Sequence, residues 1–312
     1  MAQTAAGRDD GRDDGRVRRR LRTSGGSTMT QGDTGDRADF LAAYDAMLRR
    51  WPADVTSIDV PSPYGSTRVH VCGPEAGAPL VLLPGGGTTS MAWFRNVEDL
   101  GRHHRVYAVD VMGDVGHSVN DGTPLRGAAD LTAWLDALLD GLGLGETRLC
   151  GHSYGASIAL RYALRAPRRV SGLALLDPVN CFAGPSPRYL LRALPTLLRP
   201  TVARQRAFLL WETGRPPEDP GWQDFLDSTT TAVRSKVVAL RRPWPKELRA
   251  CTVPTLVVLA GRSRTHDARR VAARARALLP GADVAVLPDA SHHTLPTERP
   301  AELNRLLARF LA

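Results

Sequence analysis

The segment Gly151-His152-Ser153-Tyr154-Gly155 constrains this chain more than any other. It reads G-x-S-x-G, follows a short and mostly apolar run at 146–150, and precedes residues 156–165, which have the apolar spacing of a helix packed by one face. On a tight strand-to-helix turn, a serine is held in a strained backbone conformation with its hydroxyl exposed, and the next backbone N–H points toward the same place. The pattern therefore predicts that Ser153 is a nucleophile.

Strand-like and helical segments alternate along most of the remaining sequence. Helical spacing is found at 39–48, 91–100, 125–142, 156–165, 268–279 and 298–310. Short apolar or alternating runs predict strands at 57–60, 67–72, 80–83, 105–109, 146–150, 170–176, 255–260 and 283–287. Such alternation is typical of an α/β fold with a mostly parallel central sheet and helices on both faces. In sheets of this kind the functional groups gather at the carboxyl ends of the strands.

The alternation is interrupted once. Residues 178–250 contain no strand-like run but several helical patches, among them 189–198 and 203–211. We interpret this segment as a helical cap insertion over the carboxyl ends of the strands. The predicted organisation is a disordered extension at 1–38, a first core part at 39–177, the cap at 178–250 and a second core part at 251–312.

The first 38 residues are of low complexity. A charged Gly-Arg-Asp-Asp repeat at 7–16 cannot bury apolar surface, which predicts disorder. The three arginines at 18–20 are not followed by an apolar stretch, so an export signal is not indicated, and no run has the length of a membrane span. We therefore expect a cytoplasmic protein without membrane association, translated from either Met1 or Met29.

Charge and cysteine content restrict the function classes. The formal net charge is +9, but the arginines are scattered as on solvated helix faces, without an aromatic-interleaved basic stripe, so nucleic acid is not an expected partner. The four cysteines have no C-x-x-C spacing, and nothing in the sequence requires a metal or a disulfide.

Three features together resemble the α/β-hydrolase superfamily: the turn Pro84-Gly85-Gly86-Gly87 after an apolar strand, the G-x-S-x-G segment, and a late histidine. The resemblance covers about Ser57 to Ala312. It implies the α/β-hydrolase fold and a serine nucleophile activated by an imidazole base, with no cofactor and no metal. By the same resemblance, the oxyanion of the reaction would be bound by the backbone N–H groups of Tyr154 and Gly86, with Gly85 as the next choice.

The late histidine is selected by its spacing. Members of the superfamily often have a histidine, four variable residues, Glu, one residue and Pro before a closing helix. His293, Glu298 and Pro300 fit this spacing, which indicates His293 rather than His292 as the base. His292 then occupies the place of the usual glycine.

The sequence departs from the family pattern at the triad acid. The usual position, three residues past a glycine that ends a strand, is held by Arg264. Asp177, which ends the strand at 170–176, is our first candidate for the acid. Asp267 is the alternative, although it also suits a helix N-cap. A site without any acid remains the third interpretation.

These features favour a serine hydrolase that cleaves a carboxylic ester of a small-molecule acyl substrate through an acyl-enzyme on Ser153. A thioesterase, a cofactor-free perhydrolase or an acyltransferase would use the same residues. The alternative from another class is a non-catalytic ligand-binding homologue, which the Arg264 departure favours. Trp222 and other aromatic residues of the cap are candidates for an acyl pocket. The acyl preference and the oligomeric state stay open.

Overall fold

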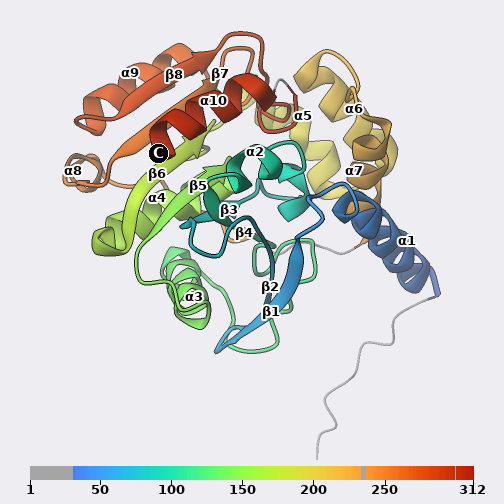
Figure 1. Cartoon of the computed structure of the whole chain (residues 1–312). Coiled ribbons are helices and arrows are strands. Elements are labelled where there is room, and N and C mark those ends of the chain that lie inside the picture. The colour runs from blue at the N-terminus through green and yellow to red at the C-terminus, as the bar shows by residue number, and fades with distance from the viewer. Residues whose placement is uncertain (1–30, 233–236, 299) are drawn as a thin grey trace, which may run out of the picture.

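The computed structural model describes residues 31–232, 237–298 and 300–312 and contains one eight-stranded sheet (Figure 1). The strand order is β1-β2-β4-β3-β5-β6-β7-β8. The strands β3 to β8 are parallel, whereas β1 pairs antiparallel with β2 and β2 antiparallel with β4. The bounds are β1 Thr56–Ser62, β2 Gly65–Cys72, β3 Ala78–Leu83, β4 His104–Val109, β5 Thr147–His152, β6 Val170–Leu176, β7 Thr255–Ala260 and β8 Asp283–Leu287. The mostly parallel α/β sheet expected from the alternation is thereby confirmed.

Two layers of helices cover the sheet because its strands alternate their side chains between two apolar clusters. In β3, Val81 and Leu83 face one cluster, and Leu80 and Leu82 face the other. The first cluster includes side chains of α3 (Ala128–Gly141), α4 (Tyr154–Arg165), α8 (Pro245–Arg249) and α9 (Ala268–Leu278). The second includes those of α1 (Gln31–Leu48), η1 (Ser90–Trp93), α2 (Val97–Gly101) and α10 (Pro300–Leu311).

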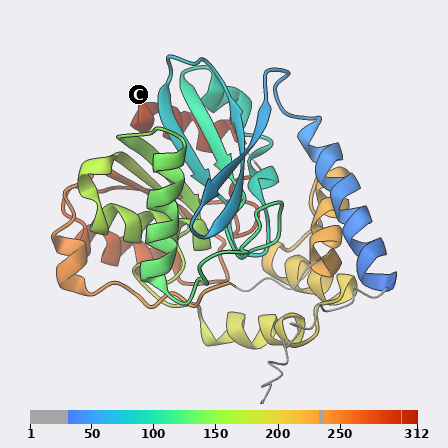
Figure 2. The same ribbon diagram turned by 90° about the horizontal axis from the view of Figure 1, so that it is seen from below.

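Three consecutive helices, which we call the cap, stand beside the sheet between β6 and β7. They are α5 (Pro187–Leu198), α6 (Val202–Thr213) and α7 (Pro220–Ala232). Figures 1 and 2 show them gathered on one side of the molecule, with α1 lying along α7. The short helix α8 lies within the predicted insertion, yet Leu248 is fully buried in the first core cluster. This helix therefore packs with the sheet layer rather than with the cap.

Helix α1 begins earlier than the sequence indicated. Disorder was expected through residue 38, but the helix starts at Gln31, so that expectation is wrong for residues 31–38. Phe40, Tyr44 and Met47 anchor the helix in the second cluster. Once a helix is nucleated, extending it by one residue requires little free energy, so the helix can continue toward Gln31. The remainder of the predicted extension, residues 1–30, lies outside the described residues.

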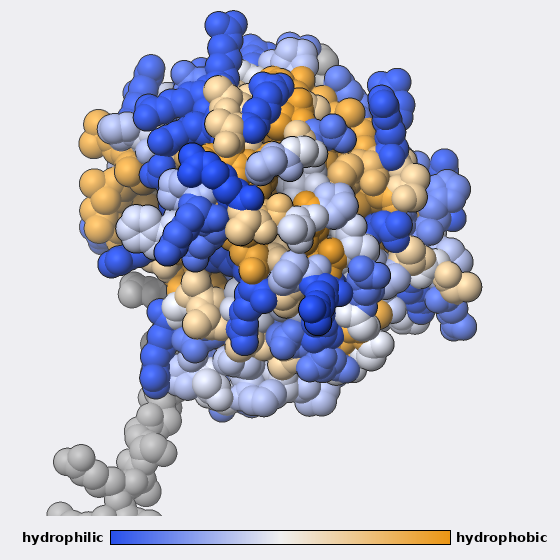
Figure 3. Space-filling model, turned by 90° about the vertical axis from the view of Figure 1, so that its left-hand side faces the viewer, coloured by the Kyte–Doolittle hydropathy of each residue, from blue (hydrophilic) through white to orange (hydrophobic). Residues whose placement is uncertain are grey.

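The face formed where α8 and α9 lie carries hydrophilic side chains interspersed with apolar ones (Figure 3). Most arginines of α9 are exposed or half-buried there, as expected for a solvated helix surface. No helix among the described residues is long and apolar enough to cross a lipid bilayer.

Candidate active site

Ser153 sits on a sharp turn between β5 and α4. Its φ of 52° and ψ of −109° are unfavourable for a residue with a side chain. Glycine is required on both sides, because a Cβ on Gly151 would lie 2.5 Å from the backbone of Gly155 and Ala156, and one on Gly155 would lie 2.3 Å from the carbonyl oxygen of Leu83. The turn places the Ser153 hydroxyl at the carboxyl end of β5, in a cavity.

The imidazole that meets Ser153 belongs to His292. Ser153 Oγ lies 2.8 Å from His292 Nε2. His293, which the spacing indicated, does not contact the serine, so that prediction is wrong. The two rings are nearly perpendicular, and His293 Nδ1 instead lies 3.0 Å from Glu212 Oε2. Adjacent residues in a loop point their side chains in different directions. An alignment that is wrong by one residue therefore gives His293 the contacts that His292 makes.

The second nitrogen of His292 contacts Asp177, which directly follows β6. His292 Nδ1 lies 2.6 Å from Asp177 Oδ2, so Nδ1 carries the proton and Nε2 is left to accept one from Ser153. Asp267 does not take part in this contact. It caps helix α9, where its side chain accepts the N–H of Arg270 at 2.9 Å.

Asp177 is fully buried and surrounded by donors. Its Oδ1 accepts the N–H of Ala260 at 3.0 Å and Nε2–H of His266 at 3.1 Å, while Oδ2 also accepts the Ser263 hydroxyl at 2.9 Å. Burial alone would raise the pKa of this carboxyl, but the hydrogen bonds from His266 and His292 outweigh it and hold the pKa far below its usual range. The group is thus ionised over any ordinary pH range and fixed in position.

His292 itself is kept neutral at neutral pH. Burial lowers its pKa below the usual value of 6.5, although Asp177 opposes this shift. The neighbouring His152 donates from Nε2 to the carbonyl oxygen of His292 at 2.9 Å, and burial lowers the pKa of His152 to about 3. His152, from the G-x-S-x-G segment, therefore supports the backbone that carries His292.

A carboxylate from the cap also holds the histidine loop. Glu212, in the last turn of α6, accepts the backbone N–H groups of His292 at 3.1 Å and His293 at 3.3 Å. A further, longer bond of 3.4 Å comes from the N–H of Arg264 in the loop after β7. Burial would raise the pKa of Glu212, but the hydrogen bond and charge of His293 lower it to about 2.

The loop after β7 is attached to the cap by further contacts. Besides its N–H bond to Glu212, Arg264 lies with its guanidinium 5.2 Å from the ring centre of Trp211 in α6. Ser186, the N-cap of α5, donates its hydroxyl to the carbonyl oxygen of Arg264 at 3.1 Å and its N–H to that of Thr265 at 2.6 Å. The position where the superfamily usually carries its acid is thus a structural contact with the cap.

The glycine turn after β3 lies against the residue that follows Ser153. A Cβ on Gly86 would lie 3.4 Å from Cβ of Tyr154, and one on Gly85 would lie 3.5 Å from Cβ of Ser153. The N–H of Gly87 donates to Asp114 Oδ2 at 2.9 Å, which fixes the turn from the loop after β4. Tyr154 is the first residue of α4, where backbone N–H groups lack partners within the helix.

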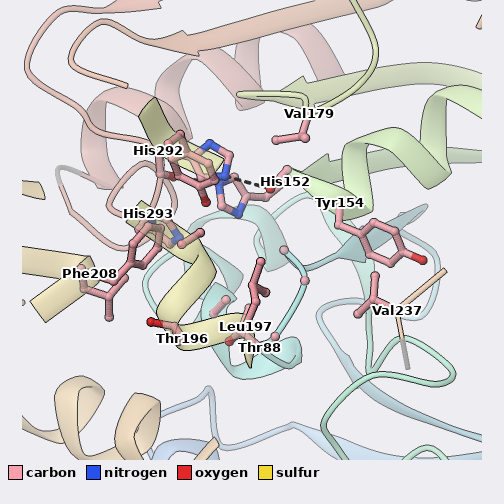
Figure 4. Close-up of a pocket in the computed structure, with 18 of the residues that line it drawn as sticks. Thr88, His152, Tyr154, Val179, Thr196, Leu197, Phe208, Val237, His292 and His293 are labelled. Atoms are coloured by element: carbon pink, nitrogen blue, oxygen red, sulfur yellow. Dashed lines mark hydrogen bonds between the residues drawn. The ribbon is translucent and has the colours of Figure 1, made fainter. Parts of the chain in front are cut away.

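A cavity of about 670 Å³ opens at Ser153 and His292, within the range of small-molecule sites. Figure 4 shows His152, His292 and His293 on one side of it and residues of the cap, such as Leu197 and Phe208, around it. The cap and the segment after it supply most of its apolar lining, namely Leu190, Ala193, Leu197, Phe208, Leu209, Trp222, Leu226, Val237, Val238 and Leu240. Among the described residues, no group of three or more His, Cys, Asp or Glu side chains is placed to hold a metal ion.

Ser153, Asp177, Tyr154 and Gly86, which the sequence indicated, lie together at this site, whereas the sequence did not indicate Glu212 or His266. The only sequence signal for the histidine that contacts Ser153 was the pair of adjacent histidines, either of which can be chosen. No sequence signal pointed to Glu212, because its partners in the histidine loop lie about 80 residues away.

Residues 80–306 match the model of the Alpha/beta hydrolase family, and the chain therefore belongs to that family. Two relatives from Bacillus subtilis (strain 168) align over nearly their whole length. The chain is 27% identical to the uncharacterized carboxylesterase nap over 89% of its own length and 93% of the relative's. It is 28% identical to the carboxylesterase YbfK over 87% and 93%.

Solved structures agree with these relatives. The crystal structure of naproxen esterase (carboxylesterase NP) from Bacillus subtilis superposes with a TM-score of 0.82 at 27% identity, covering 91% of this chain and 99% of that one. Carboxylesterase CesB (YbfK) from the same organism gives 0.82 at 26% identity, covering 89% and 99%. The likeness thus includes the cap as well as the sheet.

Proposed function

We propose that this protein is a serine hydrolase that cleaves carboxylic esters of small molecules through an acyl-enzyme. The observation that carries the proposal is the continuous chain of hydrogen bonds Ser153–His292–Asp177 at the floor of an apolar cavity. The carboxylesterase names of relatives that align over about nine-tenths of the chain support the same activity.

In the first step, Ser153 Oγ attacks the acyl carbonyl while His292 Nε2 takes its proton. Attack needs a neutral imidazole, and burial supplies one by lowering the pKa of His292. Asp177 holds the protonated nitrogen Nδ1 and stabilises the imidazolium that forms. His292 then returns the proton to the alcohol that leaves.

The backbone N–H groups of Gly86 and Tyr154 are proposed to stabilise the negative charge on the oxygen of the tetrahedral intermediate. The Tyr154 N–H lies at the positive end of α4, and the Gly86 turn packs against Tyr154. Preorganised donors of this kind are worth about 10²–10³ in rate each. A water molecule activated by His292 then hydrolyses the acyl-enzyme by the same steps in reverse.

The predicted insertion at 178–250, with the cap helices α5 to α7, is proposed to select the substrate. Most of the apolar side chains around the cavity come from this segment, whereas the proposed reacting groups come from strand ends. The acyl or alcohol part of the ester would therefore be a mainly apolar group of moderate size. A molecule with several charges would find few partners there.

The direct test is labelling with a fluorophosphonate, which reacts with activated serines without resembling the substrate. The expected result is one adduct on Ser153, located by mass spectrometry, in the wild type and in His293→Ala, and none in Ser153→Ala. Turnover of p-nitrophenyl esters should follow the same order. A folded wild-type protein that takes no label would contradict the proposal and favour a non-catalytic ligand-binding role.

A further inference from the structure

Helix α5 exposes an unusual amount of apolar surface. All five of its leucines are at least 45% exposed, and Leu191 and Leu198 reach 70% and 71%. At 100° per residue these leucines share one side of the helix. Leu190 and Leu197 border the cavity, whereas Leu191, Leu194 and Leu198 do not line it. The outer leucines are thus an apolar row without a partner within the described part of the chain.

The charges around this row have one sign. Residues 178–211 contain no acidic residue and no lysine but five arginines: Arg188, Arg192, Arg199, Arg204 and Arg206. Arg206 is paired with Asp227 of α7. The other four form no ion pair with any described residue. Arg188 and Arg192 lie over the Trp211 ring, and Arg204 donates to carbonyl oxygens at the end of α5.

In contrast to the absence of membrane association expected from the sequence, we propose that α5 is a docking site for an anionic lipid surface, into which its outer leucines insert while the flanking arginines contact the headgroups. A helix with an apolar row and unpaired cations has the composition of helices that lie in a membrane interface. The helix is about 18 Å long and lies at the outer edge of the cap, along the lower border of Figure 2, so a flat surface can reach it.

The charge pattern selects this occupant over a second copy of the chain. A symmetric dimer through α5 would bring the arginines of both copies together, and residues 178–211 offer no carboxylate to compensate them. An anionic bilayer supplies both the apolar layer for the leucines and the negative charge for the arginines. In this arrangement the cavity, bordered by Leu190 and Leu197 of the same helix, opens next to the surface.

The test measures binding of the full-length protein to vesicles by co-sedimentation. Vesicles of 3:1 phosphatidylcholine and phosphatidylglycerol should bind the wild type at least tenfold more tightly than pure phosphatidylcholine, since each arginine near the surface contributes about a factor of five. Raising the salt to 0.5 M should reverse most of this preference. Binding is read without any enzyme assay, so its failure is distinct from failure of the proposed esterase activity.

The double variant Leu191→Asp/Leu198→Asp should weaken binding at least tenfold, because each inserted leucine is worth about that factor or more. The matched control Val119→Asp/Val286→Asp changes two valines that are 50% and 44% exposed outside the cap, and should bind as the wild type does. Arg188→Gln/Arg199→Gln should lose the preference for anionic vesicles. All variants should keep wild-type turnover of soluble p-nitrophenyl acetate, which shows that they are folded.

The proposal is overturned if the wild type ignores anionic vesicles or if the leucine variant binds as well as the valine control. It is equally overturned if the leucine variant converts a wild-type dimer into a monomer in analytical ultracentrifugation without changing vesicle binding.

Discussion

Glu212 Oε2 lies 3.0 Å from Nδ1 of His293, which joins the end of cap helix α6 to the loop that carries His292. The same carboxylate accepts the backbone N–H groups of both histidines. The orientation of His292 therefore depends on the cap as well as on the sheet, and the side chain that the spacing had selected as the base acts in this connection.

Replacing Glu212 should impair turnover although it does not contact Ser153. In Glu212→Ala the N–H groups of His292 and His293 lose their acceptor, and we expect kcat to fall about 10- to 100-fold, as for a misplacement of about 1 Å. Glu212→Gln keeps an acceptor oxygen and should be milder. Glu218→Gln removes an exposed cap carboxylate and should match the wild type. An unchanged kcat in Glu212→Ala would show that the loop keeps its position without the cap.

Substitutions of the two histidines should have clearly different effects on kcat. His292→Ala removes the group that contacts Ser153 Oγ, so kcat should fall by at least about 10⁴-fold. His293→Ala removes a contact to Glu212 and should stay within about tenfold of the wild type. Measurement of kcat and KM on one p-nitrophenyl ester decides between them. The opposite order would restore the register that the sequence favoured.

Replacing Asp177 should lower kcat, whereas replacing Asp267 should lower stability. Asp177→Asn should reduce kcat on the order of 10⁴-fold, because Nδ1 of His292 then lacks the carboxylate that fixes its tautomer. Asp267→Ala removes the N-cap of α9 and should lower the free energy of unfolding by about 1 kcal/mol with kcat unchanged. Thermal unfolding and steady-state kinetics on both variants provide the comparison. A large loss of kcat in Asp267→Ala alone would refute this assignment.

The pH profile follows from the pKa of His292. Only the unprotonated imidazole can accept the Ser153 proton, and burial lowers its pKa below 6.5. The value of kcat/KM should therefore not depend on pH around pH 7. It should fall only at lower pH, as His292 gains a proton. Asp177 stays ionised throughout, so it adds no second step to this limb. A midpoint above pH 7 in the free enzyme would contradict the geometry.

Trp222 should influence both chain-length preference and stability. Its ring lines the cavity and stacks on Phe225, with centroids 5.4 Å apart. Trp222→Ala should enlarge the cavity and move the optimum toward longer acyl chains, at a cost of about 3–5 kcal/mol in unfolding free energy. Ala193→Leu narrows the same cavity and should move the optimum toward shorter chains. A series of p-nitrophenyl esters assayed below the unfolding temperature tests both shifts, and two unchanged profiles would remove these residues from substrate selection.

The strands of the sheet were predictable because each has its own local signal in the apolar pattern of the sequence. The expected strands at 170–176, 255–260 and 283–287 agree with the observed bounds, and the nucleophile turn depends on glycines that no other residue replaces. The choice between Asp177 and Asp267 could not be made from local signals, because Asp177 meets His292 only across 115 residues. The preference for His293 was wrong for a related reason: its partner, Glu212, comes from the cap.

The end of β6 supplies Asp177, while the loop after β7 supplies two of its hydrogen-bond donors, Ser263 and His266, and not the acid itself. The same loop also contacts the cap, where Ser186 and Glu212 bind the backbone of Arg264 and Thr265. The acid and the residues that contact the cap thus come from two neighbouring strand ends. Substitution of Arg264 is therefore expected to change the position of the cap relative to the sheet, and with it which substrates enter. Asp177 itself would keep its position.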